Sequence, residues 1–252
     1  MPEFDLRDAK PDDFAALAAI AKAGDSEADD LYFTFLQTAG VLRVAADAGS
    51  ILAFGGVLGI GDDTTMVTDL FVATHARGRG VGGALLAHLL DGAGKRMTFS
   101  SKHAAALPAY IRAGMVPAWR LLYLRGRSGA RDEHADGVNH EVTTDPWRRA
   151  RPDLADYFER RGGSITDNAA VITRDGETIV ARLQDHGRAD AFDTVLAEVP
   201  ANEIVTCCAP EHSPVAARAL ARGFEVFDND IFCCSPGVAL PDDLHCLDPG
   251  LC

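Results

Sequence analysis

The sequence predicts an α/β protein built on a mixed sheet, and three observations point to this class. Runs with strand periodicity alternate with runs of helical periodicity through the first half of the chain. A glycine-rich turn at 77–83 joins one strand-like run to one helix-like run. Part of the same order returns after a polar stretch at 127–145. With 252 residues, the chain is long enough for two modest domains, each with its own core.

The first half predicts the order strand, helix, helix, three strands, helix, strand, helix, strand. Apolar residues at helical spacing follow Pro11, with acids in the first turn, and predict the first helix. The stretch 47–50, Asp-Ala-Gly-Ser, lies between two apolar runs and predicts a hairpin. Gly114 predicts a helix end, because glycine accepts the left-handed conformation that closes helices. The expected strands are 3–7, 41–46, 51–60, 64–73, 97–100 and 116–125, and the expected helices are 11–23, 27–38, 82–90 and 104–113.

The second half predicts a shortened version of this order. Aligning Gly223 with Gly114 superimposes two helices that end in glycine, each followed by a strand. Position 219 is then Ala where the first half has Tyr110. We therefore expect an N-terminal domain at 1–126, a linker at 127–145 and a truncated C-terminal domain at 146–252. The expected strands of the second half are 169–173, 178–183, 203–209 and 225–234, and the expected helices include 146–160 and 189–199.

The glycine-rich turn is the strongest functional signal. A turn between a strand and a helix presents unpaired backbone N–H groups at a helix N-terminus, where anions bind. Its glycines allow positive φ and let a phosphate approach the backbone closely. Arg77 and Arg79 add positive charge. The pattern predicts a phosphate-binding loop.

Arg77, Gly80 and Gly82 fall on the three fixed positions of an Arg/Gln-x-x-Gly-x-Gly/Ala motif. The stretch therefore resembles the acyl-CoA pyrophosphate loop of the GNAT N-acetyltransferase superfamily, and residues 3–125 resemble the whole GNAT fold. The resemblance implies acetyl-CoA as cosubstrate, no metal, and direct transfer of acetyl to a primary amine in a ternary complex. The cofactor-binding residues it implies are Leu70, Phe71, Val72, Arg77, Gly78, Arg79, Gly80, Val81, Gly82, Gly83 and His103.

The resemblance also implies catalytic residues. Tyr110 lies four residues before Gly114, where the family places a general acid that protonates the departing thiolate. Asp69, in the strand before the loop, is the candidate general base. His103 stands where the family often has Asn, and it adds a titratable group. The first two helices, with Phe33 and Phe35, are expected to line the acceptor site, as that region does in the family.

Each of these residues also has an ordinary structural explanation. The glycines could form a flexible turn, and Tyr110 could be a core aromatic on an amphipathic helix. Asp69 could be a strand residue that is hydrogen-bonded to a neighbour, and His103 could be a surface histidine. The agreement of strand, arginine, glycine spacing and downstream Tyr-x-x-x-Gly favours the acyl-CoA interpretation.

Two other functions fit the sequence. A non-catalytic acyl-CoA sensor would bind its ligand through the loop and recruit a partner through the acidic second half. A mycothiol-synthase-like tandem enzyme would carry out transfer in its C-terminal unit. The matching stretch 184–188 has only one glycine and contains an acid, which disfavours that alternative. The acceptor itself is not specified: polyamines, aminoglycosides and protein amines all suit an acidic protein.

The net charge of −13 is unevenly divided. Residues 1–130 contain 13 Lys and Arg against 14 Asp and Glu, whereas residues 131–252 contain 11 against 23. An acidic surface argues against nucleic-acid binding and would attract cationic substrates. No apolar run reaches the length of a membrane span, and the first residues lack a signal-peptide pattern. We expect a cytoplasmic bacterial protein with no membrane partner, and edge strands leave a homodimer open.

All six cysteines follow residue 206. Cys207 and Cys208 are adjacent, as are Cys233 and Cys234, and adjacent residues of a strand point to opposite faces. Their spacing matches no zinc pattern. We expect buried strand thiols that pack as small hydrophobes.

Overall fold

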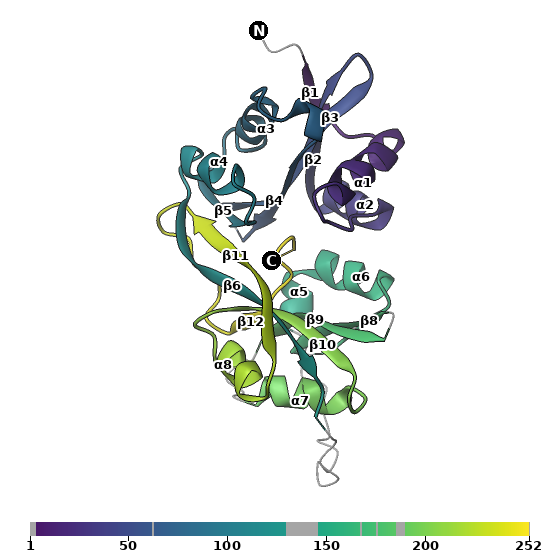
Figure 1. The fold of residues 1–252 in the computed structure, drawn as a ribbon, viewed down its shortest axis with the longest axis vertical. Coiled ribbons are helices and arrows are strands. Elements are labelled where there is room, and N and C mark those ends of the chain that lie inside the picture. Colours follow the sequence, from purple (N-terminus) through teal and green to yellow (C-terminus); the bar gives the residue numbers. More distant parts are fainter. Residues whose placement is uncertain are drawn as a thin grey trace. The chain divides into compact units, whose positions relative to one another are not determined.

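The computed structural model describes residues 4–61, 63–129, 146–166, 168–174, 176–184 and 190–251. These residues form two compact units (Figure 1). The first unit contains the residues up to Ala118 together with Phe232–Val238, and the second contains Trp119–Ile231 and Ala239–Leu251. Strands β6 (Val116–Arg127) and β11 (Glu225–Cys234) therefore contribute residues to both units. Most of the predicted linker, residues 130–145, lies outside the described residues, and the domain boundaries stay a prediction.

The first unit is built on a mixed sheet in the order β1-β2-β3-β4-β5, with the end of β11 beside β5. The pairs from β1 to β4 are antiparallel, and β4 and β5 are parallel. Both orientations in one sheet confirm the predicted fold class. The strands are β1 (Asp5–Asp8), β2 (Gly40–Asp47), β3 (Ser50–Ile60), β4 (Thr64–Val72) and β5 (Lys95–Ser100).

Helices cover both faces of this sheet. In Figure 1, α1 (Phe14–Lys22) and α2 (Asp30–Ala39) lie on one side, and α3 (Val81–Leu89) and α4 (Ala106–Arg112) lie on the other. Two short 3-10 helices, η1 (Pro11–Asp13) and η2 (Thr74–Ala76), lie in the connections. The first core forms because apolar residues of each element meet the sheet. Its fully buried members include Leu17, Phe33, Leu36, Phe54, Met66, Leu85 and Met97.

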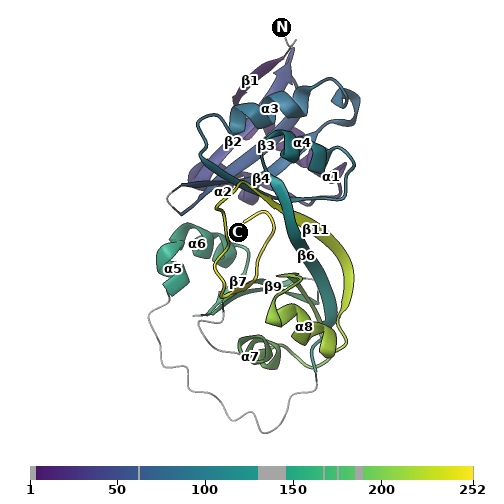
Figure 2. The ribbon, with the colours of Figure 1, turned by 90° about the vertical axis from the view of Figure 1, so that its left-hand side faces the viewer.

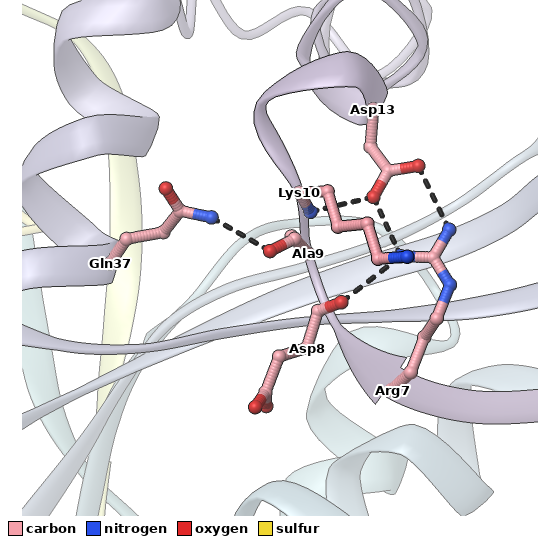
Figure 3. A network of polar contacts seen from close by, with 6 residues as sticks. All are labelled: Arg7, Asp8, Ala9, Lys10, Asp13 and Gln37. Carbon is pink, nitrogen blue, oxygen red and sulfur yellow. Dashed lines mark hydrogen bonds and ion pairs between the residues drawn. The ribbon is translucent and has the colours of Figure 1, made fainter.

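Polar contacts fix the position of α2 (Figure 3). Arg7 on β1 donates to both carboxylate oxygens of Asp13, at 2.7 and 2.9 Å. Gln37 on α2 donates its amide to the carbonyl of Ala9, at 2.8 Å. The other end of α2 is capped by Asp29, whose carboxylate accepts from the N–H of Tyr32 at 3.0 Å. Both ends of α2 are therefore held, which orients its buried face.

The second unit has the strand order β11-β6-β10-β9-β8-β7, and β12 also pairs with β9. Strands β9 and β10 are parallel, whereas β8 and β12 are antiparallel to β9. Figure 2 shows α7 and α8 on this unit. The strands are β7 (Gly163–Ile165), β8 (Ala169–Arg174), β9 (Glu177–Gln184), β10 (Ile204–Pro210) and β12 (Leu244–Cys246), and the helices are α5 (Pro146–Ala150), α6 (Pro152–Arg160), α7 (Ala191–Glu198) and α8 (Pro214–Ala221).

The two helices that the sequence aligned end in the same way. Gly114 and Gly223 have φ of +85° and +83°. After Gly114, the N–H of Met115 donates to the carbonyl of Tyr110 at 3.1 Å, and after Gly223 the N–H of Phe224 donates to the carbonyl of Ala219 at 3.0 Å. This six-residue closure is the Schellman arrangement. The internal repeat therefore extends to backbone hydrogen bonds.

No helix among the described residues is long and apolar enough to cross a membrane. Within the same residues, no group of three or more His, Cys, Asp or Glu side chains is placed to hold a metal ion. The described cysteines are free thiols, and Cys207, Cys233 and Cys246 are buried. Burial raises the pKa of the Cys233 thiol to about 11. High thiol pKa values fit the expected packing role, because the thiolate is the reactive form.

Candidate functional site

Strand β4 contains a bulge at Thr68. Gly56 on β3 faces Asp69, but the next residue, Val57, faces Val67, so Thr68 is an extra residue on β4. A Cβ atom on Gly56 would lie 2.5 Å from the Thr68 hydroxyl and 3.7 Å from the Asp69 carboxylate. The bulge therefore brings two consecutive side chains to the same face, which an ordinary strand does not do.

Strand β4 also separates from β5 at this point. The parallel pairing runs from Thr64 opposite Lys95 to Val67 opposite Thr98, and the Thr98 hydroxyl donates to the Val67 carbonyl at 2.9 Å. Strand β4 continues to Val72, and no pairing with another strand is described on this side of Thr68–Val72. This stretch includes the predicted contacts Leu70, Phe71 and Val72. Its backbone groups can therefore pair with an extended ligand, as an added strand would.

The glycine-rich loop follows β4 and opens α3. Gly78 and Gly80 have φ of +77° and +79°, which glycine adopts without strain. The first helical hydrogen bond runs from the N–H of Ala84 to the carbonyl of Gly80, at 3.0 Å. The N–H groups of 81–83 precede that bond and have no helical acceptor. Together with the exposed Arg77 and Arg79, they are the groups on which the predicted anion site depends, and that site stays a prediction.

The loop is tied to the strand edge through Val72. The guanidinium of Arg77 donates to the Val72 carbonyl at 3.2 Å. A Cβ atom on Gly82 would lie 2.9 Å from a methyl of Val72, which is closer than side chains normally approach. Gly82 therefore allows the helix start to lie against the strand. The structure brings the predicted loop and the predicted strand residues together.

Asp69 is buried, with 9 % of its surface exposed, and it accepts a hydrogen bond from Tyr32. The phenolic oxygen of Tyr32 lies 2.5 Å from Oδ2 of Asp69. Tyr32 comes from α2 and is itself only 9 % exposed. The sequence analysis did not assign a role to Tyr32. Its hydroxyl distinguishes it from the neighbouring aromatic residues of α2, Phe33 and Phe35, and could have drawn attention to it. A hydrogen-bonded, buried carboxylate beside a strand bulge can accept or orient a proton-bearing ligand group.

Two of the remaining predicted residues, Tyr110 and His103, follow β5, and Phe33 lies on α2. Tyr110 is on α4 and is 6 % exposed. His103 is exposed, and its Nδ1 accepts from the N–H of Ala105 at 3.2 Å, so it caps a turn before α4. Phe33 is fully buried, with ring centroids 5.3 Å from Phe14 and 5.7 Å from Phe54, so it belongs to the core of this face.

The matching stretch of the second unit is 184–188, and apart from Gln184 at the end of β9 it lies outside the described residues. The predicted absence of a phosphate loop there thus stays a prediction. The flanking strand and helix, β9 and α7, are described, and α7 begins after Asp190.

One family model and several solved structures match this chain. The family model described as an acetyltransferase (GNAT) domain matches residues 38–116, from the end of α2 to the start of β6. No curated protein matches the chain.

Solved structures match nearly the whole chain. A candidate acetyltransferase of Pyrococcus horikoshii superimposes with a TM-score of 0.77 at 14 % identity, covering 100 % of this chain and 96 % of that one. A tandem GNAT protein from the clavulanic acid biosynthesis pathway superimposes with a TM-score of 0.59 at 17 % identity. The match covers 95 % of this chain and 100 % of that one. A GCN5-related N-acetyltransferase of Sphaerobacter thermophilus superimposes with a TM-score of 0.59 at 15 % identity. The match covers 95 % of this chain and 98 % of that one. At such identities, the likeness shows the fold.

Proposed function

We propose that the first unit transfers acetyl from acetyl-CoA to a primary amine, because residues 38–116 match the GNAT acetyltransferase domain and the chain has the fold of tandem GNAT proteins. Both substrates are bound together, and the amine attacks directly. The observation that carries the proposal is the separation of β4 from β5 at Val67, directly before the glycine-rich loop.

The chain's own groups fit acetyl-CoA. The edge of β4 at Leu70–Val72, beyond the end of the pairing with β5, receives the amide groups of the pantetheine arm as a strand would. The N–H groups at the start of α3 receive the pyrophosphate, whose charge the helix N-terminus favours. A Cβ on Gly78, Gly80 or Gly83 would meet no other atom within 4 Å, so phosphate oxygens can approach the loop.

The proposed reaction removes two protons from the acceptor nitrogen and delivers one to the departing sulfur. A free alkyl ammonium has a pKa of about 10.4, so the acceptor must lose a proton before it attacks. We assign that proton to Asp69. The amine nitrogen then bonds to the thioester carbonyl carbon, the carbon–sulfur bond breaks, and Tyr110 donates a proton to the departing sulfur. The nitrogen gives up its second proton as the amide forms, and that proton restores Tyr110. The products are an N-acetyl amide and the free thiol of coenzyme A.

Thermal unfolding with and without acetyl-CoA tests the cosubstrate site. At about 100 times its dissociation constant, a ligand stabilises the folded state by about 2.7 kcal/mol, which raises the midpoint by a few degrees. Replacing Gly82 with Phe abolishes the shift, because the side chain enters the loop and meets Val72. Gly59→Ala is the control, since Gly59 is exposed on β3 and its Cβ would meet no atom within 4 Å.

A panel of primary amines then tests transfer, with release of free thiol as the measurement. Release that depends on the added amine supports the proposed enzyme. A thermal shift without amine-dependent release would instead favour the non-catalytic sensor. No shift at all would contradict the cosubstrate site.

A further inference from the structure

Three polar groups meet at the β4 bulge, on the sheet face that α2 covers. The bulge turns Thr68 and Asp69 to this face, and Tyr32 reaches Asp69 from α2. A Cβ on Gly56 would meet both the Thr68 hydroxyl and, at 2.9 Å, the side chain of Leu36 on α2. Because Gly56 has no side chain, these groups fit between β3 and α2.

The Thr68 hydroxyl is the least expected member of this group. Its oxygen is buried and has no hydrogen-bond partner among the described residues. A buried polar group without a hydrogen-bond partner destabilises the fold, so folded proteins contain few of them. Valine has nearly the same shape and would avoid that cost. A hydroxyl retained beside a carboxylate indicates a ligand that supplies the missing hydrogen bond.

We propose that Thr68, Asp69 and Tyr32 form the seat for the ammonium end of the acceptor, an inference that rests on the proposed acetyl transfer. An alkyl ammonium brings three N–H donors and no acceptor, so it requires oxygen acceptors around it. Asp69 accepts one N–H and takes the proton that leaves. Thr68 Oγ1 accepts another. Tyr32 is a positioning residue, because its hydroxyl donates to Asp69 Oδ2 and fixes how the carboxylate points.

The seat selects a chemical class. A carboxylate paired with a hydroxyl acceptor binds a cationic primary amine better than a neutral alcohol or amide of the same shape, because charge-assisted hydrogen bonds are stronger. Cationic aliphatic amines are therefore the expected acceptors. The transfer leaves a neutral amide, which lacks both the charge and two of the donors and so leaves the seat readily.

Thr68→Val tests the seat most directly. The variant keeps the side-chain shape and removes an unpaired hydroxyl, so we expect an unfolding midpoint equal to or above that of the wild type. We expect KM for the amine to rise about 10-fold, which is the loss of one hydrogen bond to a charged group, with KM for acetyl-CoA unchanged. A hydroxyl with only a structural role would leave KM for the amine unchanged, and that result would overturn the seat.

A double-mutant cycle tests Tyr32. Tyr32→Phe lowers kcat about 10-fold with little change in KM for acetyl-CoA, since only the orientation of the carboxylate is lost. In an Asp69→Asn background, the same substitution has no further effect, because Tyr32 acts through Asp69. Tyr123→Phe is a matched control: the Tyr123 hydroxyl donates to Asp230 at 2.8 Å in the second unit, and its loss leaves kcat unchanged.

Fully additive losses in the cycle would overturn the role given to Tyr32. If Tyr32→Phe does not fold, as judged by circular dichroism, Thr68→Val still decides whether the seat exists. Wild-type protein without amine-dependent transfer would overturn the proposed function and this inference together. Wild-type transfer with an unchanged amine KM in Thr68→Val would overturn this inference alone.

Discussion

Strands β4 and β9 are the corresponding strands of the two units, and they share an irregularity. On β4, the register with β3 skips Thr68, and on β9 the register with β8 skips Ala181. In each case, the pairing with the following parallel strand ends one residue before the skipped position, at Val67 and at Val180. Both units therefore carry the same bulge followed by the same separation of two parallel strands.

The difference lies in what occupies the separated edge. In the second unit, β12 pairs with β9, with Leu244 opposite Gln184 and Cys246 opposite Leu183. The N–H of the next residue, Leu247, also donates to the carbonyl of Cys208 on β10, at 3.1 Å. The C-terminal strand thus fills the place between β9 and β10 that corresponds to the proposed cosubstrate site of the first unit. The same backbone arrangement pairs with the chain itself in the second unit and is proposed to pair with a ligand in the first.

The side chains at matching positions differ in the same sense. Thr68 corresponds to Ala181, and Asp69 corresponds to Arg182. Arg182 is buried, donates to Gln184 at 3.2 Å, and lies over the ring of Trp147 at 5.4 Å. An arginine cannot accept a proton at neutral pH. The polar groups proposed for catalysis are therefore replaced by packing and internal hydrogen bonds in the second unit.

The largest expected effect is the complete absence of a second cosubstrate site. We expect isothermal titration to give one acetyl-CoA per chain, because β12 already uses the backbone groups of β9. In Gly82→Phe, the number of sites falls to zero. Two sites per wild-type chain, or one site remaining in Gly82→Phe, would break the comparison between β4 and β9.

The next effect concerns Tyr110, which corresponds to Ala219 in the second unit. Tyr110→Phe should lower kcat by about 10- to 1000-fold with little change in acetyl-CoA affinity, as expected when a proton donor is lost. Tyr157→Phe is the control, because Tyr157 is also buried, accepts from Arg161 at 2.9 Å, and lies in the second unit. Equal kcat for Tyr110→Phe and wild type at every pH would rule out the general-acid role.

Periodicity and glycine positions predicted most of the fold. The helix ends at Gly114 and Gly223 and the hairpin at 47–50 depend on local backbone preferences, which the sequence displays directly. The loop could be predicted for the same reason, since its glycines and its place between strand and helix are local features.

The bulge and its consequences could not be predicted in this way. Whether Thr68 faces a partner residue on β3 depends on the register between β3 and β4. The residues of β3 lie eight or more positions before Thr68, and no local sequence signal marks the bulge. The contact of Tyr32 with Asp69 joins residues 37 apart. The pairing of β12 with β9 is equally non-local. Tertiary packing decides all three, so they became visible only in the structure.

The smallest expected effect concerns the ion pair between Arg7 and Asp13. This pair holds the connection between β1 and α1, and Gln37 of α2 donates to Ala9 in the same connection. The hydrogen bond from Arg7 lowers the pKa of Asp13, so this carboxylate stabilises the fold above its unfolded pKa of about 3.9 and stops doing so as pH falls further. We expect Asp13→Asn to reduce the free energy of unfolding by about 1 kcal/mol at neutral pH, a modest value because Arg7 is partly exposed. The difference from wild type should shrink steadily below about pH 4, as measured by urea unfolding at several pH values.

Asp8→Asn supplies the matched comparison for that experiment. Asp8 also pairs with an arginine, Arg43, at 3.1 Å, but its side chain is 80 % exposed. Exposed pairs contribute little because water screens them, so we expect a change near zero at every pH. A loss for Asp13→Asn that does not depend on pH would show that shape, and not the charge on Asp13, holds the connection between β1 and α1. The position of α2 would then depend on the hydrogen bond from Gln37 to Ala9 and on the Asp29 cap. The hydrogen bond from Tyr32 to Asp69 would not require the ion pair.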